Sequence, residues 1–197
     1  MSTALRPRPG RPAGQRSPDG RLRRRRALYH LTAPVAVLTV SHGGVLHGTT
    51  VSTVTTVSRE PLLLGTCLRS GSQFAELAAA AGRYAVNVLT GAQADLARYF
   101  ADGSRPGGAA QFADLGWEPD PYAHAPLLDG ALAHYTCRLA GSAPLGDHEV
   151  LIGHVTHAAV HEGGTPLLSY AGGLFSGPPT PARDPGPGRH TRKESAA

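Results

Sequence analysis

The chain has 197 residues, which is enough for one domain of ordinary size with additional segments at its ends. Residues 1–26 hold nine Arg and few large apolar side chains, and residues 176–197 are rich in Pro, Gly and Arg. Such compositions bury too little apolar surface to fold. We therefore expect two disordered tails, 1–26 and 176–197, around a single domain at 27–175.

The net charge of +5 is a property of these tails. Residues 27–175 carry six Arg, no Lys and eleven acidic side chains, so the expected domain has a net charge of −5. An acidic domain argues against a nucleic-acid-binding face. Any phosphate that it holds must be bound by Arg, hydroxyl groups and backbone amides.

The cysteines and the hydropathy of the sequence indicate the cellular compartment of the protein. Cys67 and Cys137 are 70 residues apart, without a metal-type or disulfide-rich pattern, which favours two reduced thiols in the cytoplasm. Polar residues and Pro34 interrupt the apolar run after Arg26, so it does not resemble a signal peptide. We expect no segment that spans a membrane.

The first part of the expected domain has strand composition. Residues 35–40 form an apolar strand, and the turn residues His42-Gly43-Gly44 predict a hairpin back into Val45. Residues 46–58 are almost entirely Thr, Ser and Val, which favours one long strand that ends before Pro61. Residues 62–68 then predict a short buried strand.

Helix signals follow. Ser72 is placed to cap a helix at residues 73–81, and Gly82 is placed to end it. A strand is expected at 84–89. Thr90 and Gln93 fit a capping box that opens a second helix at 91–100.

The rest of the chain returns to strands after an irregular excursion. Residues 101–130 are rich in Gly, Pro, Asp and Ala, with Trp117 as an apolar anchor. Residues 131–140, 150–160 and 167–170 have strand composition. The count of six to seven strands, mostly adjacent in sequence, with two or three short helices predicts a mainly β protein with an antiparallel barrel.

A succession of patches from about Leu31 to Phe175 resembles the flavin reductase-like family of FMN-binding split-barrel proteins. No single patch is diagnostic, and the resemblance lies in their joint order and spacing. The patches are Gly48 to Pro61, Cys67 to Ser72, Arg83 to Leu89, Gln93, Leu96 to Phe100, Pro126 to Ala133, Cys137, Gly146-Asp147-His148 and Gly153-His154-Val155.

This resemblance implies a flavin site. The segment Thr50–Thr53 would line the isoalloxazine edge, and the loop from Cys67 to Ser72 would receive the flavin phosphate at the start of a helix. Without the resemblance, a Thr-rich edge strand, a solvated Arg69, a simple N-cap and a structural thiol at Cys67 would account for the same residues. The implied cofactor-binding set is Thr50, Val51, Ser52, Thr53, Ser58, Cys67, Leu68, Arg69, Ser70, Ser72 and Gln73.

His148 matches the histidine that contacts nicotinamide or the reacting ring in the family. A neutral imidazole can donate one hydrogen bond to a carboxamide near pH 7. The alternative is a turn histidine that caps a hairpin. His154, His157 and His161 have strand surroundings without a supporting Cys or carboxylate pattern, so we expect no metal site.

The sequence departs from the family pattern at several positions. Thr49 stands where Met is usual, Leu62 replaces a proline, Gln73 replaces a Thr, and Thr136 replaces a Glu. Residues 166–173 keep the family's glycines but lack the aromatic residue and the Arg that commonly precede them. These departures affect the face that would bind nicotinamide or substrate more than the site that would bind the flavin.

The resemblance implies an NAD(P)H-dependent flavin reductase that passes hydride to FMN or FAD and supplies a partner monooxygenase. It also implies a homodimer, with the flavin near the seam. One alternative is an FMN-dependent oxidase with tightly bound flavin that acts on an organic substrate. Another is a non-catalytic module whose basic N-terminal tail binds an acidic partner.

Overall fold

The computed structural model describes residues 18–177. Its strands form a seven-stranded sheet of order β3-β2-β6-β9-β10-β5-β4, a three-stranded sheet β1-β11-β12 and a pair β7-β8. All pairings are antiparallel. The predicted mainly β, antiparallel architecture is confirmed, with seven strands in the main sheet.

The elements follow one another in this order: α1 (Pro18–Ala27), η1 (Leu28–His30), β1 (Ala33–Pro34), β2 (Ala36–His42), β3 (Val45–Val51), β4 (Thr55–Arg59), β5 (Leu62–Arg69), α2 (Gln73–Ala81), β6 (Arg83–Val88), η2 (Gly91–Gln93), α3 (Ala94–Ala101), η3 (Gly108–Phe112), β7 (Trp117–Pro119), β8 (Pro126–Leu128), β9 (Ala133–Leu145), β10 (His148–Val160), β11 (Leu167–Tyr170) and β12 (Gly173–Ser176).

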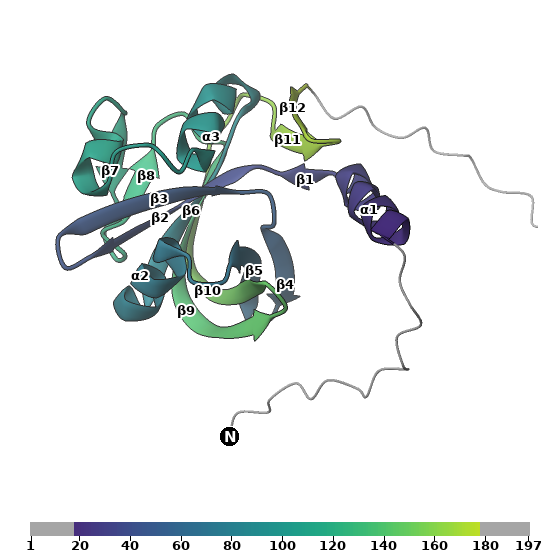
Figure 1. The fold of residues 1–197 in the computed structure, drawn as a ribbon. Coiled ribbons are helices and arrows are strands. Elements are labelled where there is room, and N and C mark those ends of the chain that lie inside the picture. The colour runs from purple at the N-terminus through teal and green to yellow at the C-terminus, as the bar shows by residue number, and fades with distance from the viewer. Residues whose placement is uncertain (1–17, 178–197) are drawn as a thin grey trace, which may run out of the picture.

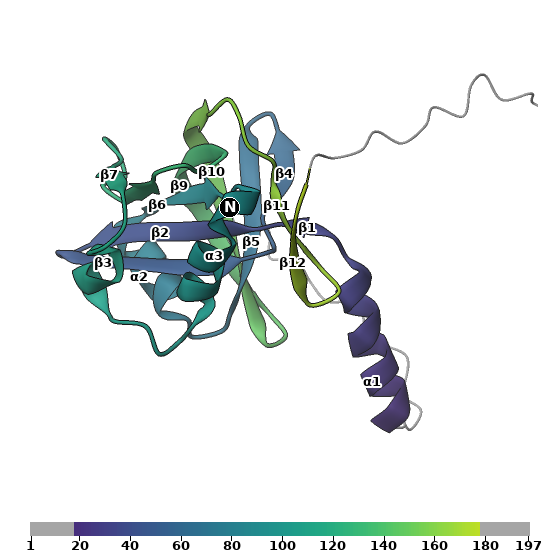
Figure 2. The same ribbon diagram turned by 90° about the horizontal axis from the view of Figure 1, so that it is seen from above.

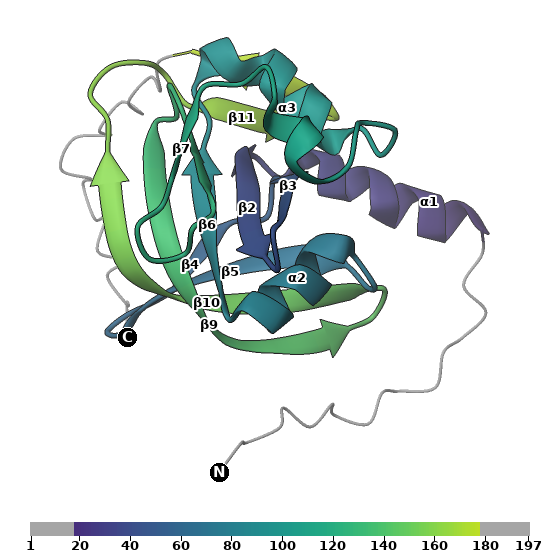
Figure 3. The same ribbon diagram turned by 90° about the vertical axis from the view of Figure 1, so that its left-hand side faces the viewer.

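The main sheet bends strongly, with the long strands β9 and β10 curving round to the side of β5 and β4 (Figures 1 and 3). Its two edge strands are β3 and β4. The predicted β2–β3 hairpin is confirmed, with Gly43 and Gly44 at positive φ in its turn. Because β3 is an edge, half of its backbone groups face away from the sheet.

Two apolar clusters hold the helices to the sheet. One lies under α2 and contains Leu38, Phe74 and Leu151, and the other lies under α3 and contains Val37 and Phe100. Side chains of β2 contribute to both clusters, since successive residues of a strand point to opposite faces. The side chain of Trp117 packs against the second cluster, as its predicted role as an anchor requires.

The helix α2 has the predicted bounds and caps. The Ser72 hydroxyl accepts a hydrogen bond from the Ala75 amide, and Gly82 ends the helix in the left-handed conformation. The capping box of Thr90 and Gln93 is also present. This capping box opens the 3-10 turn η2. The α-helix α3 begins only at Ala94, because the backbone dihedral angles of Gln93 are not α-helical.

The single strand expected at 46–58 was wrong. Between β3 and β4, residues 52–54 pair with no strand. The cause is a tertiary contact: the Thr53 hydroxyl donates to the Cys67 carbonyl and accepts from the Cys67 amide, each at 3.0 Å. These two bonds turn the chain from one edge of the sheet to the other.

The predicted tail boundaries need correction. Residues 18–26 belong to the helix α1, which Pro18 opens at a position where its missing amide hydrogen costs nothing and which good helix formers, Arg and Leu, continue. At the other end, Ser176 is the last residue of β12, reached through the turn at Ala171 and Gly172. The rest of the expected tails, 1–17 and 178–197, lies outside the described residues.

The excursion at 101–130 is more regular than predicted. It contains the 3-10 turn η3 and the short pair β7-β8. Its buried Asp120 accepts hydrogen bonds from two backbone amides and from the Thr136 hydroxyl, which fixes the loop to β9. The loop is therefore a tethered part of the fold.

Candidate functional site

The free edge of β3 is the first feature of the candidate site. The Gly48 amide donates to Gln111 Oε1 at 3.2 Å, and the Gly48 carbonyl accepts from the Arg105 guanidinium. Both Gly48 groups therefore point away from β2. Because backbone direction alternates along a strand, the amide and carbonyl of Thr50 also point away from the sheet.

Arg105 and Gln111 close one end of this edge. Gln111 is buried and bonds to Leu46 and Gly48, in the manner of a strand partner. Arg105 also bonds to the Asp102 carbonyl at 2.7 Å and to Gln111 Oε1 at 3.2 Å. Neither residue was predicted from the sequence. Beyond Gly48, the edge is left open toward Ser52.

Arg105 lines a polar cavity of about 220 Å³ with His47 and Gln73. Burial, followed by the charge of Arg105, lowers the pKa of His47 to about 4. Arg105 is half-buried, and the described residues offer its guanidinium no carboxylate within ion-pair distance. The cavity therefore places a neutral imidazole and a cation, which interacts with the Asp102 carboxylate only beyond ion-pair distance, beside the first residue of α2.

The loop before α2 supplies a second group of anion-binding elements. Arg69 and Ser70 are exposed. The Ser70 and Ser72 amides are used within the protein, by the carbonyls of Asp147 and Arg69. The first amides of α2, at Gln73 and Phe74, precede its internal hydrogen bonds, and the helix dipole favours an anion there. We call the Arg69–Gln73 loop and Arg105 together the phosphate end, after the group that the sequence resemblance places at this loop.

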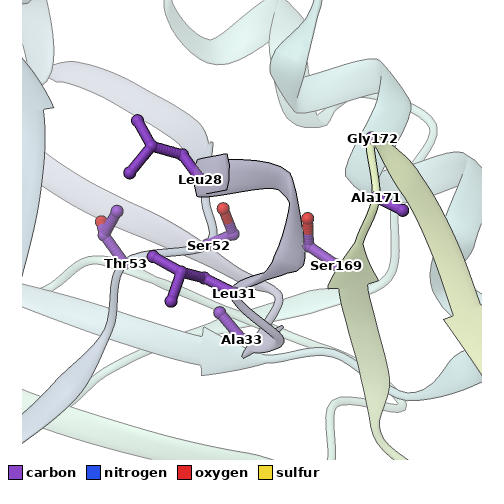
Figure 4. Close-up of a pocket in the computed structure, with 8 residues that line it drawn as sticks. All are labelled: Leu28, Leu31, Ala33, Ser52, Thr53, Ser169, Ala171 and Gly172. Carbon is purple, nitrogen blue, oxygen red and sulfur yellow. The ribbon is translucent and has the colours of Figure 1, made fainter. Parts of the chain in front are cut away.

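The corner at Ser52 and Thr53 opens onto a cavity of about 500 Å³. Figure 4 shows Leu28 and Leu31 of the η1 segment on the side of Thr53, with Ser169 and Ala171 beyond that segment. No charged side chain lines the cavity. We call it the ring end. Its lining residues are Leu28, Leu31, Ala33, Ser52, Thr53, Ser169, Ala171 and Gly172.

The structure brings several predicted residues together. Thr53 is bonded to Cys67, and Arg69 follows Cys67 by two residues at the end of β5. Thr50 donates its hydroxyl hydrogen to the Ala97 carbonyl at 2.8 Å, so its backbone is the part that remains available. The Thr53 hydroxyl is likewise engaged by β5. Ser52 keeps an exposed side chain at the ring end.

Three predicted residues take other places. The side chains of Val51 and Leu68 lie in the apolar core under α2, so only their backbone could meet a ligand. Ser58 pairs with Leu63, six residues and about 20 Å along β5 from Arg69. Ser58 is thus remote from the phosphate end within one chain.

His148 lies directly opposite Arg69 in the β5–β10 ladder. Its Nδ1 is 2.7 Å from the Asp147 carboxylate, and its side chain is about half exposed. A hydrogen bond from Nδ1–H to that carboxylate leaves Nε2 directed elsewhere. His148 does not line the cavity at the ring end, and the structure places it beside the Arg69 loop.

The other histidines form no metal cluster. His161 is within 3.0 Å of His134 Nδ1, and His134 Nε2 is 3.0 Å from the Leu128 carbonyl. Within residues 18–177, no group of three or more His, Cys, Asp or Glu is placed to hold a metal. In the same part of the chain, no helix is long and apolar enough to cross a membrane.

The arrangement suits a long, flat ligand with an anionic end. Comparison with known proteins identifies the family: residues 28–178 match the model described as "Flavin reductase like domain". The chain belongs to this family of flavin reductase-like proteins, and the split-barrel fold predicted from the sequence is confirmed.

Relatives with assigned activities cover most of the chain. An NADPH-flavin oxidoreductase of Streptomyces viridifaciens is 39% identical over 157 residues, which are 79% of this chain and 81% of that protein. An NADH-dependent FMN reductase of Streptomyces nodosus subsp. asukaensis is 36% identical over 177 residues, 87% of this chain and 95% of that protein. The solved structure of the NADH:FAD oxidoreductase of Streptomyces globisporus C-1027 superposes with a TM-score of 0.75 at 30% identity, covering 86% of this chain and all of that one.

The residues present fit a flavin. A flavin needs hydrogen-bond partners along one ring edge, an uncharged space for the ring and cations for its phosphate. The outward backbone of Thr50 meets the first need, the ring end meets the second, and Arg69, Arg105 and the start of α2 meet the third.

Proposed function

We propose that this protein is an NAD(P)H:flavin oxidoreductase that reduces FMN or FAD and supplies the reduced flavin to a partner monooxygenase. The observation that carries the proposal is the open edge of β3 between an uncharged cavity and a cationic loop. About 13 Å of strand separates Gly48 from Ser52, which matches an elongated cofactor better than a compact one.

The bound flavin would supply the redox chemistry, since it accepts hydride directly from a stacked nicotinamide. The chain's own task is to position the two rings. The backbone of Thr50 and the backbone and hydroxyl of Ser52 hold the ring edge, and Leu28 and Leu31 restrict water at the ring end. Arg69, Arg105 and the Gln73 amide hold the phosphate.

His148 has a positioning role in this scheme. Its Nδ1 is held by Asp147, and the ladder partner Arg69 fixes its backbone beside the phosphate loop. From there its Nε2 is available to the carboxamide of a nicotinamide. His148 lies outside the ring cavity of its own chain. It can contact the nicotinamide if a second copy of the chain brings its β9–β10 turn, which carries His148, near the ring.

We therefore also propose a homodimer. Val57 and Leu62, on the edge strand β4 and its neighbour β5, are 52% and 38% exposed, and both offer apolar surface to a second copy. Light scattering on the purified chain should give twice the monomer mass. A monomer at working concentration would contradict this part and leave flavin reduction to be judged separately.

The partner is proposed to be an oxygenase component. The relatives include the reductase component of a 4-hydroxyphenylacetate 3-monooxygenase of Pseudomonas aeruginosa, 33% identical over 147 residues. The two unpaired cysteines support a reducing, cytoplasmic location for this reaction.

The direct experiment is to record the visible spectrum of the purified protein and then follow nicotinamide oxidation with and without added FMN, FAD and riboflavin. We expect a nearly colourless preparation whose NAD(P)H oxidation depends on added flavin. A tightly bound flavin that survives dialysis, with no stimulation by free flavin, would contradict the reductase proposal and favour an oxidase. No NAD(P)H oxidation under any condition would overturn the reductase proposal.

A further inference from the structure

The helix α1 carries the densest charge in the described part of the chain. Its ten residues include five Arg, at position 21 and at positions 23–26, against one acidic residue, Asp19. The element that α1 contacts most is η1, the next along the chain. Figures 1 and 2 show α1 projecting away from the barrel beside β1.

The end of α1 leads directly to the ring end. Arg26 precedes Leu28 by two residues, which is about 3 Å along a helix axis, and Leu28 lines the cavity. Arg23 and Arg26 are exposed. A segment with an apolar turn at the cavity and a cationic helix just outside it can contact both the ring and the phosphates of a dinucleotide.

Arg23 and Arg26 lie three residues apart on α1, where side chains are neighbours and like charges repel. A ten-residue helix is also marginal by itself. An anion held by these arginines would reverse that repulsion. The rest of the domain has a net charge of −5, so a short anionic ligand fits better than an extended polyanion that would also meet the acidic surface.

We propose that Arg23 and Arg26 of α1 bind the 2′-phosphate of NADPH at the mouth of the ring cavity and make NADPH the preferred hydride donor. The inference rests on the proposed function, because a nicotinamide stacked on a flavin in the cavity must leave its adenosine phosphates outside it. The cavity lining contributes no charge, so the neighbouring arginines of α1 provide the discrimination between NADPH and NADH.

The test is the double variant Arg23→Gln/Arg26→Gln in the full-length protein, assayed with both donors at saturating FMN. The KM for NADPH should rise roughly tenfold, while the KM for NADH and both kcat values stay close to wild type. Raising the salt concentration should weaken NADPH use in the wild type and have less effect in the variant.

The matched control is Arg98→Gln/Arg138→Gln, which removes the same charge from two exposed arginines on α3 and β9. This control should keep the wild-type KM for NADPH. An unchanged KM for NADPH in the α1 variant, or equal increases for NADPH and NADH, would overturn the proposal. So would a control that behaves like the α1 variant, since the effect would then come from net charge.

A binding measurement separates this inference from the proposed function. Titration calorimetry with adenosine 2′,5′-bisphosphate and with 5′-AMP needs no turnover. Stronger binding of the bisphosphate by the wild type, lost in the α1 variant, would support the inference even if no flavin were reduced. Equal binding of the two nucleotides would overturn it even in an active reductase.

Discussion

The two ends of the candidate flavin groove differ in chemistry. The phosphate end has Arg69, the start of α2, and Arg105 beside the neutral His47, whereas the ring end is lined by small, hydroxyl and apolar residues without charge. Polar recognition is therefore concentrated at the flavin phosphate, whose charge does not change during the reaction. The ring end leaves room for two stacked rings whose charge changes during reaction.

The difference predicts that changes at the phosphate end depend on the flavin phosphate. Replacing Arg69 by Ala should raise the Kd for FMN about 10- to 100-fold, because a charge-assisted hydrogen bond is lost. Riboflavin lacks the phosphate and should bind the variant as it binds the wild type. Fluorescence quenching of both flavins measures the two constants.

The control for this variant is Arg138→Ala, which removes an exposed Arg on β9. It should leave both flavin affinities unchanged. If Arg69→Ala weakened riboflavin as much as FMN, Arg69 would act through the shape of the loop rather than on the phosphate.

The two ends should also differ in their response to pH. Burial and Arg105 lower the pKa of His47 to about 4, below its ordinary value of 6.5. The unfolded chain then binds the proton first as pH falls, so this part of the stability is fully present above pH 6.5 and is lost on the way down to about pH 4. Between pH 7 and pH 5 the loss should be up to about 2 kcal/mol.

Urea unfolding at the two pH values tests this prediction with the variant His47→Gln. The variant should lose stability at pH 7, where the native imidazole packs near Phe74, but should show a shallower fall toward pH 5. An unchanged slope in His47→Gln would mean that another group titrates.

Sequence alone predicted the elements whose signals are local. Ser72, Gly82 and the Thr90–Gln93 pair each act within one turn of chain, and the structure has them as predicted. Arg105 and Gln111 could not be found in this way. They reach Gly48 from positions 57 and 63 residues further along the chain, out of a loop whose composition indicates only irregularity.

The corner at Ser52–Val54 was missed for a related reason. A run of Thr, Ser and Val favours one continuous strand, and the competing bonds come from Thr53 to Cys67, across the sheet. The lapse in strand pairing is what exposes Ser52 at the ring end. The break in strand pairing at residues 52–54 was thus not predictable from local propensity, although it opens the ring end of the candidate site.

At the ring end, the expected effects are smaller and independent of the phosphate. Ser52→Ala should raise the Kd values for FMN and riboflavin together, by about fivefold, since a neutral hydrogen bond contributes about 1 kcal/mol. The titration used for Arg69→Ala measures it. Weakening of FMN alone would place Ser52 at the phosphate, which would remove the distinction between the two ends.

The smallest effect is expected at Leu31, whose side chain is 68% exposed although it lines the cavity. Leu31→Ala removes little buried area from the free protein, so its melting temperature should stay within about 1 °C of wild type. Both flavins should bind about twofold more weakly, because the ring loses part of an apolar wall. Val160 is 76% exposed and is not one of the residues that line the cavity, so Val160→Ala should change neither quantity. If Leu31→Ala lowered the melting temperature without changing the flavin affinity, Leu31 would anchor η1 to the barrel, and the ring would not contact this wall.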